Sequence, residues 1–150
     1  MNHFLSLLFF LLVVMGGGIA IGTITAPGEW YTALQKPNFN PPNWIFGPVW
    51  TVVYVIIAFV GWRLYQHQGR TSLMRLWFAQ MCLNFLWSPV FFAAQRPELA
   101  LGIILFLLLT IVCFVRAAWR PDRLSALLFI PYIAWVGFAS VLNGAIVYLN

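Results

Sequence analysis

The stretch WYTALQKPNFNPPNWIFGPVW, residues 30–50, lies between two of the most apolar segments of the chain. It contains four prolines, three tryptophans and three asparagines. Because proline fixes its own φ and biases the preceding residue toward extended conformations, residues 36–44 are expected to be stiff and non-helical. The stretch therefore predicts a long, rigid loop between two apolar segments.

The composition of the chain does not allow a polar shell around a single aqueous core. Of the 150 residues, 63% are hydrophobic and 7% are charged, and the charged residues cluster between long apolar runs. A net charge of +5 would suggest nucleic-acid binding in a soluble protein. Here the basic residues flank apolar segments, so we expect a lipid bilayer as the partner and no nucleic acid.

Five stretches are long enough to supply the roughly 20 mostly apolar residues that a helix needs to cross the hydrocarbon core of a membrane. They are residues 4–25, 46–65, 72–94, 98–118 and 124–148. The connections after the second, third and fourth stretches are short, so consecutive helices are expected to pack antiparallel. The sequence therefore predicts an all-α integral membrane bundle of five transmembrane helices, in one domain over residues 1–150, with the Pro/Trp-rich loop between helices 1 and 2.

The basic residues are distributed unevenly between the two expected ends of the bundle. The first and third loops hold Lys36 and Arg96. Those near the second and fourth loops, on the side of the N-terminus, are Arg63, Arg70, Arg75, Arg116, Arg120 and Arg123. The positive-inside rule therefore predicts that the N-terminus is cytoplasmic and that residues 30–50 lie outside the cytoplasm.

The first span also has features of a secretory signal, because an apolar run over residues 4–15 is followed by small residues. A positively charged region is missing, since only His3 stands near the start of the run. Gly18 and Gly22 have the small-xxx-small spacing that lets two membrane helices approach closely. We therefore expect a transmembrane helix, with that close contact either within one chain or between two chains.

The ionisable residues argue against conventional catalysis and metal binding. The acidic residues and the histidines lie at span ends, in a loop or at the N-terminus, so no span is expected to contain a proton-carrying carboxylate or a haem-ligating imidazole. Both cysteines lie in apolar runs without a paired motif, which suggests a packing role. These residues are Glu29, Glu98, Asp122, His3, His67, Cys82 and Cys113.

Uncharged polar and aromatic residues recur at helical spacing on three of the spans, where positions three and four apart are neighbours. The three faces are Phe46, Trp50 and Tyr54; Gln80, Asn84, Trp87 and Ser88; and Trp135, Ala139 and Asn143. An amide facing lipid would lack hydrogen-bond partners, so these faces are expected to turn inward. Each residue taken singly fits interhelical packing, whereas the three faces together favour a pocket for a flat, largely apolar molecule.

The prolines suggest how this pocket is shaped. Pro89 and Pro131 lie inside the third and fifth spans, where each removes a backbone donor and predicts a kink. The kinks would widen the bundle beside Trp87 and Trp135. The loop is interpreted either as a lid over the pocket or as a rigid cap that pins two helices. As a lid it would contribute aromatic walls from Tyr31, Trp30 or Trp44.

Three long motifs in the chain closely resemble one known family. They are W-Y-x-x-L-x-K-P-x-x-x-P-P-x-W-x-x-G-P-V-W-x-x-x-Y over residues 30–54, A-Q-x-x-x-N-x-x-W-x-P-V-F-F over residues 79–92, and P-Y-x-x-W-x-x-F-A-x-x-L-N over residues 131–143. In this order they resemble the TspO family, the tryptophan-rich sensory proteins related to the mitochondrial translocator. The resemblance extends over nearly the whole chain.

This resemblance implies a commonly dimeric membrane protein, here of the bacterial cell membrane, with a cavity beneath the first loop. Its implied ligands are porphyrins such as protoporphyrin IX and benzodiazepine-type compounds, with a role in tetrapyrrole handling or stress regulation. By correspondence of motifs, Trp50 and Trp135 match the cavity tryptophans of the family, Tyr31 its loop tyrosine, Asn84 its third-helix amide and Ala139 a small residue near the ligand. The sterol pattern of animal relatives is incomplete after Tyr148, which makes sterol binding doubtful.

Three functions remain open at this point. The first is binding or transport of a tetrapyrrole that stacks on Trp50 and Trp135, with its carboxylates near Lys36 or Arg96. The second is an enzyme that degrades porphyrin with light and oxygen through the same two tryptophans. The third is a structural or regulatory membrane scaffold.

No obligatory cofactor and no metal site are expected, and haem is a further candidate ligand. Haem iron normally takes a His, Cys, Met or Tyr ligand, and both histidines lie outside the expected pocket. Metal-free protoporphyrin is therefore expected to bind at least as tightly as haem. Cys82 and Tyr54 remain candidate iron ligands.

Overall fold

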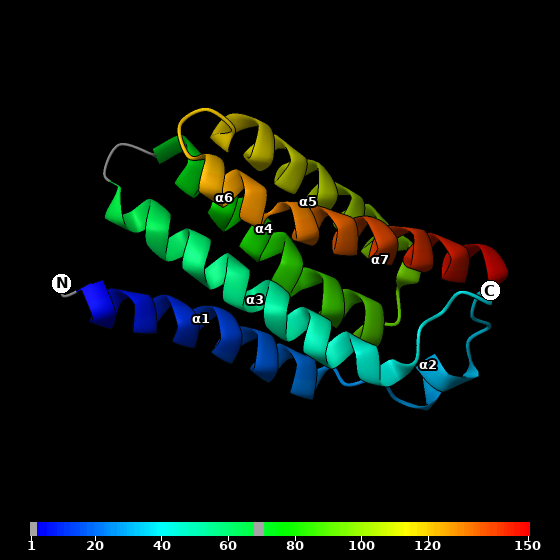
Figure 1. The fold of residues 1–150 in the computed structure, drawn as a ribbon. Coiled ribbons are helices and arrows are strands. Elements are labelled where there is room, and N and C mark those ends of the chain that lie inside the picture. Colours follow the sequence, from blue (N-terminus) through cyan, green and yellow to red (C-terminus); the bar gives the residue numbers. More distant parts are fainter. Residues whose placement is uncertain (1–2, 68–70) are drawn as a thin grey trace.

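The computed structural model describes residues 3–67 and 71–150, which form an elongated bundle of long helices (Figure 1). Five helical spans are long and apolar enough to cross a membrane, and no strand occurs within the described residues. The spans are His3–Ile24, Asn43–Gln66, Ser72–Ala93, Pro97–Ala118 and Arg123–Leu149. The prediction of an all-α membrane bundle with five helices is confirmed.

The helical elements divide these spans more finely than the sequence suggested. In chain order they are α1 (His3–Ile24), α2 (Glu29–Ala33), α3 (Asn43–Gln66), α4 (Thr71–Ser88), the π-helical turn η1 (Pro89–Ala93), α5 (Pro97–Ala118), α6 (Arg123–Leu128) and α7 (Ile130–Leu149). The closest packing joins α1 to α3, α4 to α5, and α5 to α7. The third span is therefore α4 with η1, and the fifth is α6 with α7.

Pro89 and Pro131, the two prolines for which the sequence predicts a kink, both lie at an irregularity in their span. Pro89 begins η1, where the amide of Ala94 donates to the carbonyl of Pro89 at 2.9 Å instead of closing an α-turn. Pro131 stands at the start of α7, just after the break at Phe129 that ends α6. A proline near the start of a helix is tolerated because its missing N–H has no intrahelical acceptor there.

The loop between the first two spans contains more helix than its prolines suggest. The short helix α2 precedes Pro37, and α3 begins at Asn43, so Asn43 and Trp44 are helical where a non-helical loop was expected. Proline restricts itself and the residue before it. The residues that follow Pro42 are free to enter a helix, and this explains the correction.

The two ends of the bundle have different structures (Figure 1). At one end, α2 and the loop lie beside the end of α7. There the side-chain oxygen of Asn150 accepts from the backbone N–H of Gln35 at 2.9 Å. The side-chain amide of Asn150 donates to the backbone carbonyl of Gln35, also at 2.9 Å. These two hydrogen bonds fasten the loop to the fifth span. The N-terminus and the turn between α5 and α6 lie at the opposite end.

That opposite end is held by buried and partly buried polar contacts. The hydroxyl of Ser6 on α1 accepts from the indole N–H of Trp62 at 3.0 Å and from the amide of Gln66 at 2.8 Å. Arg63 of α3 donates to the carboxylate of Asp122 at 3.0 Å, and Ser125 donates to the same carboxylate at 2.7 Å. Side chains therefore tie α1, α3 and α6 together at this end.

The electrostatic environment of Asp122 keeps its side chain ionised. Burial alone would raise the pKa of the carboxyl, but hydrogen bonds from Ser125 and Arg63, together with the charge of Arg63, lower this pKa below its ordinary value. Asp122 is also the N-cap of α6, accepting from the backbone amide of Ser125. The carboxylate therefore both pairs with a cation and starts a helix.

The cysteines differ from the expectation. Cys82 and Cys113 are both exposed on the outer surface of the bundle and do not form part of its core. In a membrane-spanning bundle an outward apolar position meets lipid, so a small, weakly polar thiol is tolerated there without packing partners.

Candidate functional site

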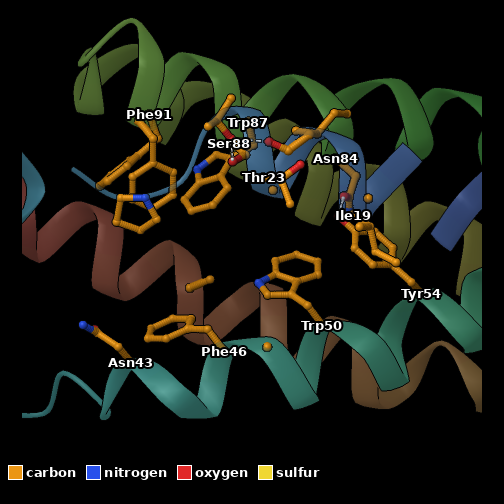
Figure 2. A pocket seen from close by; sticks show the side chains of 18 of the residues that line it. Ile19, Thr23, Asn43, Phe46, Trp50, Tyr54, Asn84, Trp87, Ser88 and Phe91 are labelled. Carbon is orange, nitrogen blue, oxygen red and sulfur yellow. Dashed lines mark hydrogen bonds between the residues drawn. The ribbon is translucent and has the colours of Figure 1, made fainter. Parts of the chain in front are cut away.

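A cavity of about 750 Å³ lies between α1, α3, α4 and α7, next to the loop that contains α2. This volume is within the range of roughly 300–1,000 Å³ that is typical of small-molecule sites. Figure 2 shows Phe46 and Trp50 on one wall, facing Trp87 and Phe91 across open space. The structure therefore contains a hollow of ligand size that is walled largely by aromatic rings.

All nine residues predicted for the pocket line this one cavity. They are Tyr31, Phe46, Trp50, Tyr54, Asn84, Trp87, Trp135, Ala139 and Asn143. Four elements that are distant in sequence bring them together, namely α2, α3, α4 and α7. Gln80, from the same predicted face as Asn84, is buried but does not reach the cavity.

The sequence did not indicate two parts of the wall. The side of α1 that includes Gly18, Ile19 and Gly22 lines the cavity, as do Phe91 and Phe92 of η1. Phe91 stacks on Trp87 with ring centroids 5.2 Å apart, and this contact could have been suspected from their i, i+4 spacing. The contribution of α1 has no comparable signal, because its apolar residues show no polar face.

The two glycines of the α1 pair, Gly18 and Gly22, have different surroundings. A side chain at Gly18 would overlap the ring of Tyr54 on α3, whereas nothing lies within 4 Å of a Cβ placed at Gly22. Gly18 therefore allows a close helix contact within the chain, and Gly22 leaves the cavity wall open. A contact between two chains through the Gly18/Gly22 pair stays a prediction.

This difference gives a testable expectation for stability. Gly18→Leu is expected to lower the free energy of unfolding by about 1–3 kcal/mol, because it overpacks the contact with Tyr54. The matched control is Gly16→Leu on the exposed side of the same helix, where a Cβ has no neighbour within 4 Å. Denaturant unfolding in detergent measures both variants, and equal stabilities would contradict the assignment.

A chain of hydrogen bonds runs from the cavity wall into the core. The hydroxyl of Tyr54 donates to the Asn84 side-chain oxygen at 3.0 Å, and the Asn84 amide donates to the Tyr132 hydroxyl at 2.6 Å. Tyr132 in turn donates to the side-chain oxygen of Gln80 at 2.8 Å, and Gln80 donates to the carbonyl of Trp77. These bonds fix the side-chain amide of Asn84 and the hydroxyl of Tyr54, both of which belong to residues that line the cavity.

A second set of contacts fixes the indole of Trp87. Its N–H donates to the side-chain oxygen of Asn143 at 3.1 Å, and the Asn143 amide donates to the carbonyl of Pro97 at 2.9 Å. Beside it, the hydroxyls of Ser88 and Thr25 share a hydrogen bond of 2.6 Å between α4 and the end of α1. Wall positions on α1, α4 and α7 are thereby held without any charged group.

Trp135 differs from the other polar residues of the wall. Its ring lies 5.7 Å from that of Phe46 and 6.3 Å from that of Trp50, both edge-on. Its indole N–H is one of two buried side-chain polar atoms in the described residues that have no hydrogen-bond partner. A buried donor without a partner is costly, and this N–H has almost no accessible surface through which a ligand in the cavity could reach it.

Of the three loop residues considered as aromatic walls of the cavity, one lines it. Tyr31 is buried and lines the cavity, and its ring contacts those of Phe91 and Phe92. Burial raises the pKa of the Tyr31 hydroxyl above its ordinary value, so this group stays neutral at physiological pH. Trp30 packs on Phe91 outside the cavity, and Trp44 is 73% exposed. Of the alternatives Tyr31, Trp30 and Trp44 for an aromatic wall from the loop, Tyr31 is therefore the one that lines the cavity.

The basic residues expected near a bound carboxylate are also outside the cavity. Lys36 donates to the carbonyls of Tyr31, Thr32 and Leu34, and its ammonium lies 4.5 Å from the centre of the Tyr31 ring. Arg96 is exposed, 4.0 Å from Glu98. Among the described residues, no three His, Cys, Asp or Glu side chains gather as a metal site.

Five membrane-spanning helices, four of which enclose an aromatic cavity next to the Pro/Trp-rich loop, define a small integral membrane protein with an internal site of ligand size. The chain belongs to the TspO/MBR family, whose sequence profile matches residues 9–149.

Relatives of the chain come from bacteria, archaea and animals. It is 33% identical to the tryptophan-rich sensory protein of Cereibacter sphaeroides, over all of this chain and 95% of that protein. It is 36% identical to the tryptophan-rich protein TspO of Archaeoglobus fulgidus, over 99% of each chain. The translocator protein of Homo sapiens is 33% identical over 84% of this chain and 79% of its own length.

Proposed function

We propose that the cavity binds a flat, largely apolar molecule of the tetrapyrrole class, such as protoporphyrin IX. The observation that carries this proposal is the meeting of three aromatic faces, from α3, α4 and α7, around one cavity of about 750 Å³. A porphyrin offers a wide apolar surface for stacking and edge-on contact with such rings.

A role in sensing or moving this ligand fits the relatives, two of which are named sensory protein and translocator protein. The cavity lies within the membrane-spanning part of the bundle and next to the loop that Asn150 fastens to α7. A hydrophobic ligand dissolved in the bilayer would therefore meet the site at membrane depth. We propose that the protein holds its ligand there as a receptor or carrier.

The basic residues at each end of the bundle support a proposed orientation in the membrane. At the end that contains the N-terminus, the described basic residues are Arg63, Arg75, Arg116, Arg120 and Arg123; Arg70 lies outside the described residues. Lys36 and Arg96 are near the cavity end. By the positive-inside rule we propose a cytoplasmic N-terminus, with the cavity toward the opposite side of a bacterial cell membrane.

A substitution that fills the cavity tests the proposal directly. Ala139 is buried and lines the cavity on α7, whereas Ala134 on the same helix is exposed and does not. Ala139→Phe is expected to weaken protoporphyrin IX binding by at least about tenfold, equivalent to about 1.4 kcal/mol. Ala134→Phe is expected to leave binding unchanged.

Saturable quenching of tryptophan fluorescence in detergent measures the affinity, and the melting temperature of each variant checks that it is folded. Because a ligand that binds only the native state stabilises it, protoporphyrin IX should also raise the melting temperature of the unmodified protein. Absence of both saturable quenching and this rise would refute the proposal. So would equal binding by the two alanine variants.

A further inference from the structure

Three arginines surround the turn that joins α5 to α6, at the end of the bundle that contains the N-terminus (Figure 1). Arg116 stands in the last turn of α5, Arg120 lies in the connecting turn, and Arg123 begins α6. All three are exposed, and none of them pairs with a carboxylate of the described residues. The turn therefore presents three cations without an acidic partner in a short stretch of chain.

The acidic residues of the protein are not placed to balance these cations. The chain contains three of them, and Glu29 and Glu98 lie at the opposite end, in the first turns of α2 and α5. The third, Asp122, has a fully buried side chain that accepts from Arg63 and Ser125. A counter-charge for the exposed arginines must therefore come from outside the chain.

The turn itself is ordered, so its arginines extend from fixed positions. The backbone N–H of Asp122 donates to the carbonyl of Ala118 at 2.8 Å, and that of Ala126 donates to the carbonyl of Asp122 at 3.1 Å. These bonds fix the backbone on both sides of Asp122. The starting points of the Arg120 and Arg123 side chains are fixed with it.

Trp119 indicates the level of this turn in the membrane. Its ring is 43% exposed, and the guanidinium of Arg123 lies 5.3 Å from the ring centre, within the range of a cation–π contact. Tryptophan is enriched where the hydrocarbon core of a bilayer meets the headgroups. Because Trp119 directly follows the span Pro97–Ala118, the neighbouring guanidinium groups are expected at the depth of the lipid phosphates.

The guanidinium group is well suited to a phosphate ligand. It presents N–H donors in a planar fork that matches phosphate oxygens, and the resulting hydrogen bonds are charge-assisted. In a zwitterionic phospholipid the phosphate is already balanced by the ammonium group of the same molecule. An anionic phospholipid keeps a net negative charge, so basic residues beside a membrane span attract it more strongly.

We propose that Arg116, Arg120 and Arg123 form a binding site for the headgroup of an anionic phospholipid, with Trp119 beside it at the membrane interface. The lipid phosphate supplies the counter-charge that the protein lacks at this turn and reduces the repulsion among the three cations. None of the three arginines lines the cavity, so the site is independent of the ligand proposed there. With a cytoplasmic N-terminus, the lipid belongs to the cytoplasmic leaflet.

The test counts the lipids that stay bound to the purified, delipidated protein in native mass spectrometry. Phosphatidylglycerol and phosphatidylcholine with the same acyl chains are supplied at equal mole fractions in the detergent micelles. Each basic residue near an anionic lipid surface contributes roughly a fivefold gain in binding. The unmodified protein is therefore expected to retain phosphatidylglycerol over phosphatidylcholine by at least about tenfold.

Removal of charge from the site provides the comparison. Arg116→Gln/Arg120→Gln is expected to reduce the preference for phosphatidylglycerol at least about fivefold. Arg116→Lys/Arg120→Lys keeps both charges and is expected to retain most of the preference. The control is Arg96→Gln at the opposite end, where the arginine is 61% exposed and has Glu98 beside it; this exchange is expected to leave the preference unchanged. Near-ultraviolet circular dichroism checks that each variant is folded.

Three results would overturn the proposal. The first is equal retention of the two lipids by the unmodified protein. The second is an unchanged preference in the glutamine pair, or a loss in the lysine pair or in Arg96→Gln as large as that in the glutamine pair. The third comes from competition with glycerol 1-phosphate at the same total concentration as phosphatidylglycerol. Glycerol 1-phosphate is expected to displace little of the bound lipid, and full displacement would show a site for a soluble phosphate instead of a lipid.

Discussion

Asp122→Ala is expected to lower the free energy of unfolding by about 3 kcal/mol, the scale for removing one partner of a buried ion pair. The Asp122 side chain is fully buried, and the Arg63 side chain paired with it is 29% exposed. Removing the carboxylate also removes the acceptor for the Ser125 hydroxyl and the N-cap of α6. Denaturant unfolding in detergent, followed by near-ultraviolet circular dichroism, measures the loss.

Glu98→Ala is the control for this prediction. Glu98 is 65% exposed and lies 4.0 Å from Arg96, so solvent screens the pair and its removal is expected to cost less than about 0.5 kcal/mol. If Asp122→Ala were no more destabilising than Glu98→Ala, the polar contacts at the N-terminal end would not hold the bundle together.

The pH dependence of the same carboxylate provides a second measurement. Because the folded pKa of Asp122 is lower than its value of 3.8 in the unfolded chain, the contribution to stability is fully present above pH 3.8. It is lost as the pH falls through the folded pKa. The stabilities of the unmodified protein and Asp122→Asn are therefore expected to differ at neutral pH and to approach each other only below pH 3.8.

The spans and three of the cavity walls could be predicted because each follows from a local pattern. Length and hydropathy alone mark a membrane helix. An amide such as Asn84 or Asn143 cannot face lipid unsatisfied, so its helical neighbours Trp87 and Ala139 had to turn inward with it. The structure buries both amides, with 4% and 2% of their surface exposed.

What the sequence did not predict depends on contacts between distant segments. The wall from α1 arises because Gly18 lets Tyr54 approach, and an almost uniformly apolar helix does not indicate which side will face the cavity. Trp30 and Trp44 resemble Trp50 in sequence, since all three stand in one aromatic stretch. Only the path of the loop, with Asn150 fastened to Gln35, decides which ring reaches the cavity and which faces outward.

The tryptophans that line the cavity also give the largest expected effect on ligand binding. Trp50 stacks on Tyr54 with ring centroids 5.5 Å apart, and its edge meets Trp135 at 6.3 Å. Together these rings form the aromatic surface that α3 and α7 present to a ligand. Tryptophan is enriched among the few residues whose truncation costs about 2 kcal/mol or more at binding interfaces.

The double variant Trp50→Ala/Trp135→Ala is expected to weaken protoporphyrin IX binding on the order of a hundredfold, equivalent to about 2.8 kcal/mol. The control is Trp44→Ala/Trp119→Ala, which removes two tryptophans that are 73% and 43% exposed and lie outside the cavity. Absorbance of the porphyrin reports binding in both variants, so the loss of tryptophan fluorescence does not affect the comparison. Equal affinities would show that the ligand does not contact the cavity tryptophans.

A single substitution then separates stacking from hydrogen bonding. Trp135→Phe keeps an aromatic ring beside Phe46 and Trp50 but removes the indole N–H, which has no partner in the protein. Because this N–H is buried from the cavity, Trp135→Phe is expected to keep most of the affinity, whereas a loss of about tenfold, close to the 1.4 kcal/mol of one neutral hydrogen bond, would show that the ligand reaches the N–H. The double-variant effect then belongs to aromatic contact, because that contribution disappears only when the rings themselves are removed.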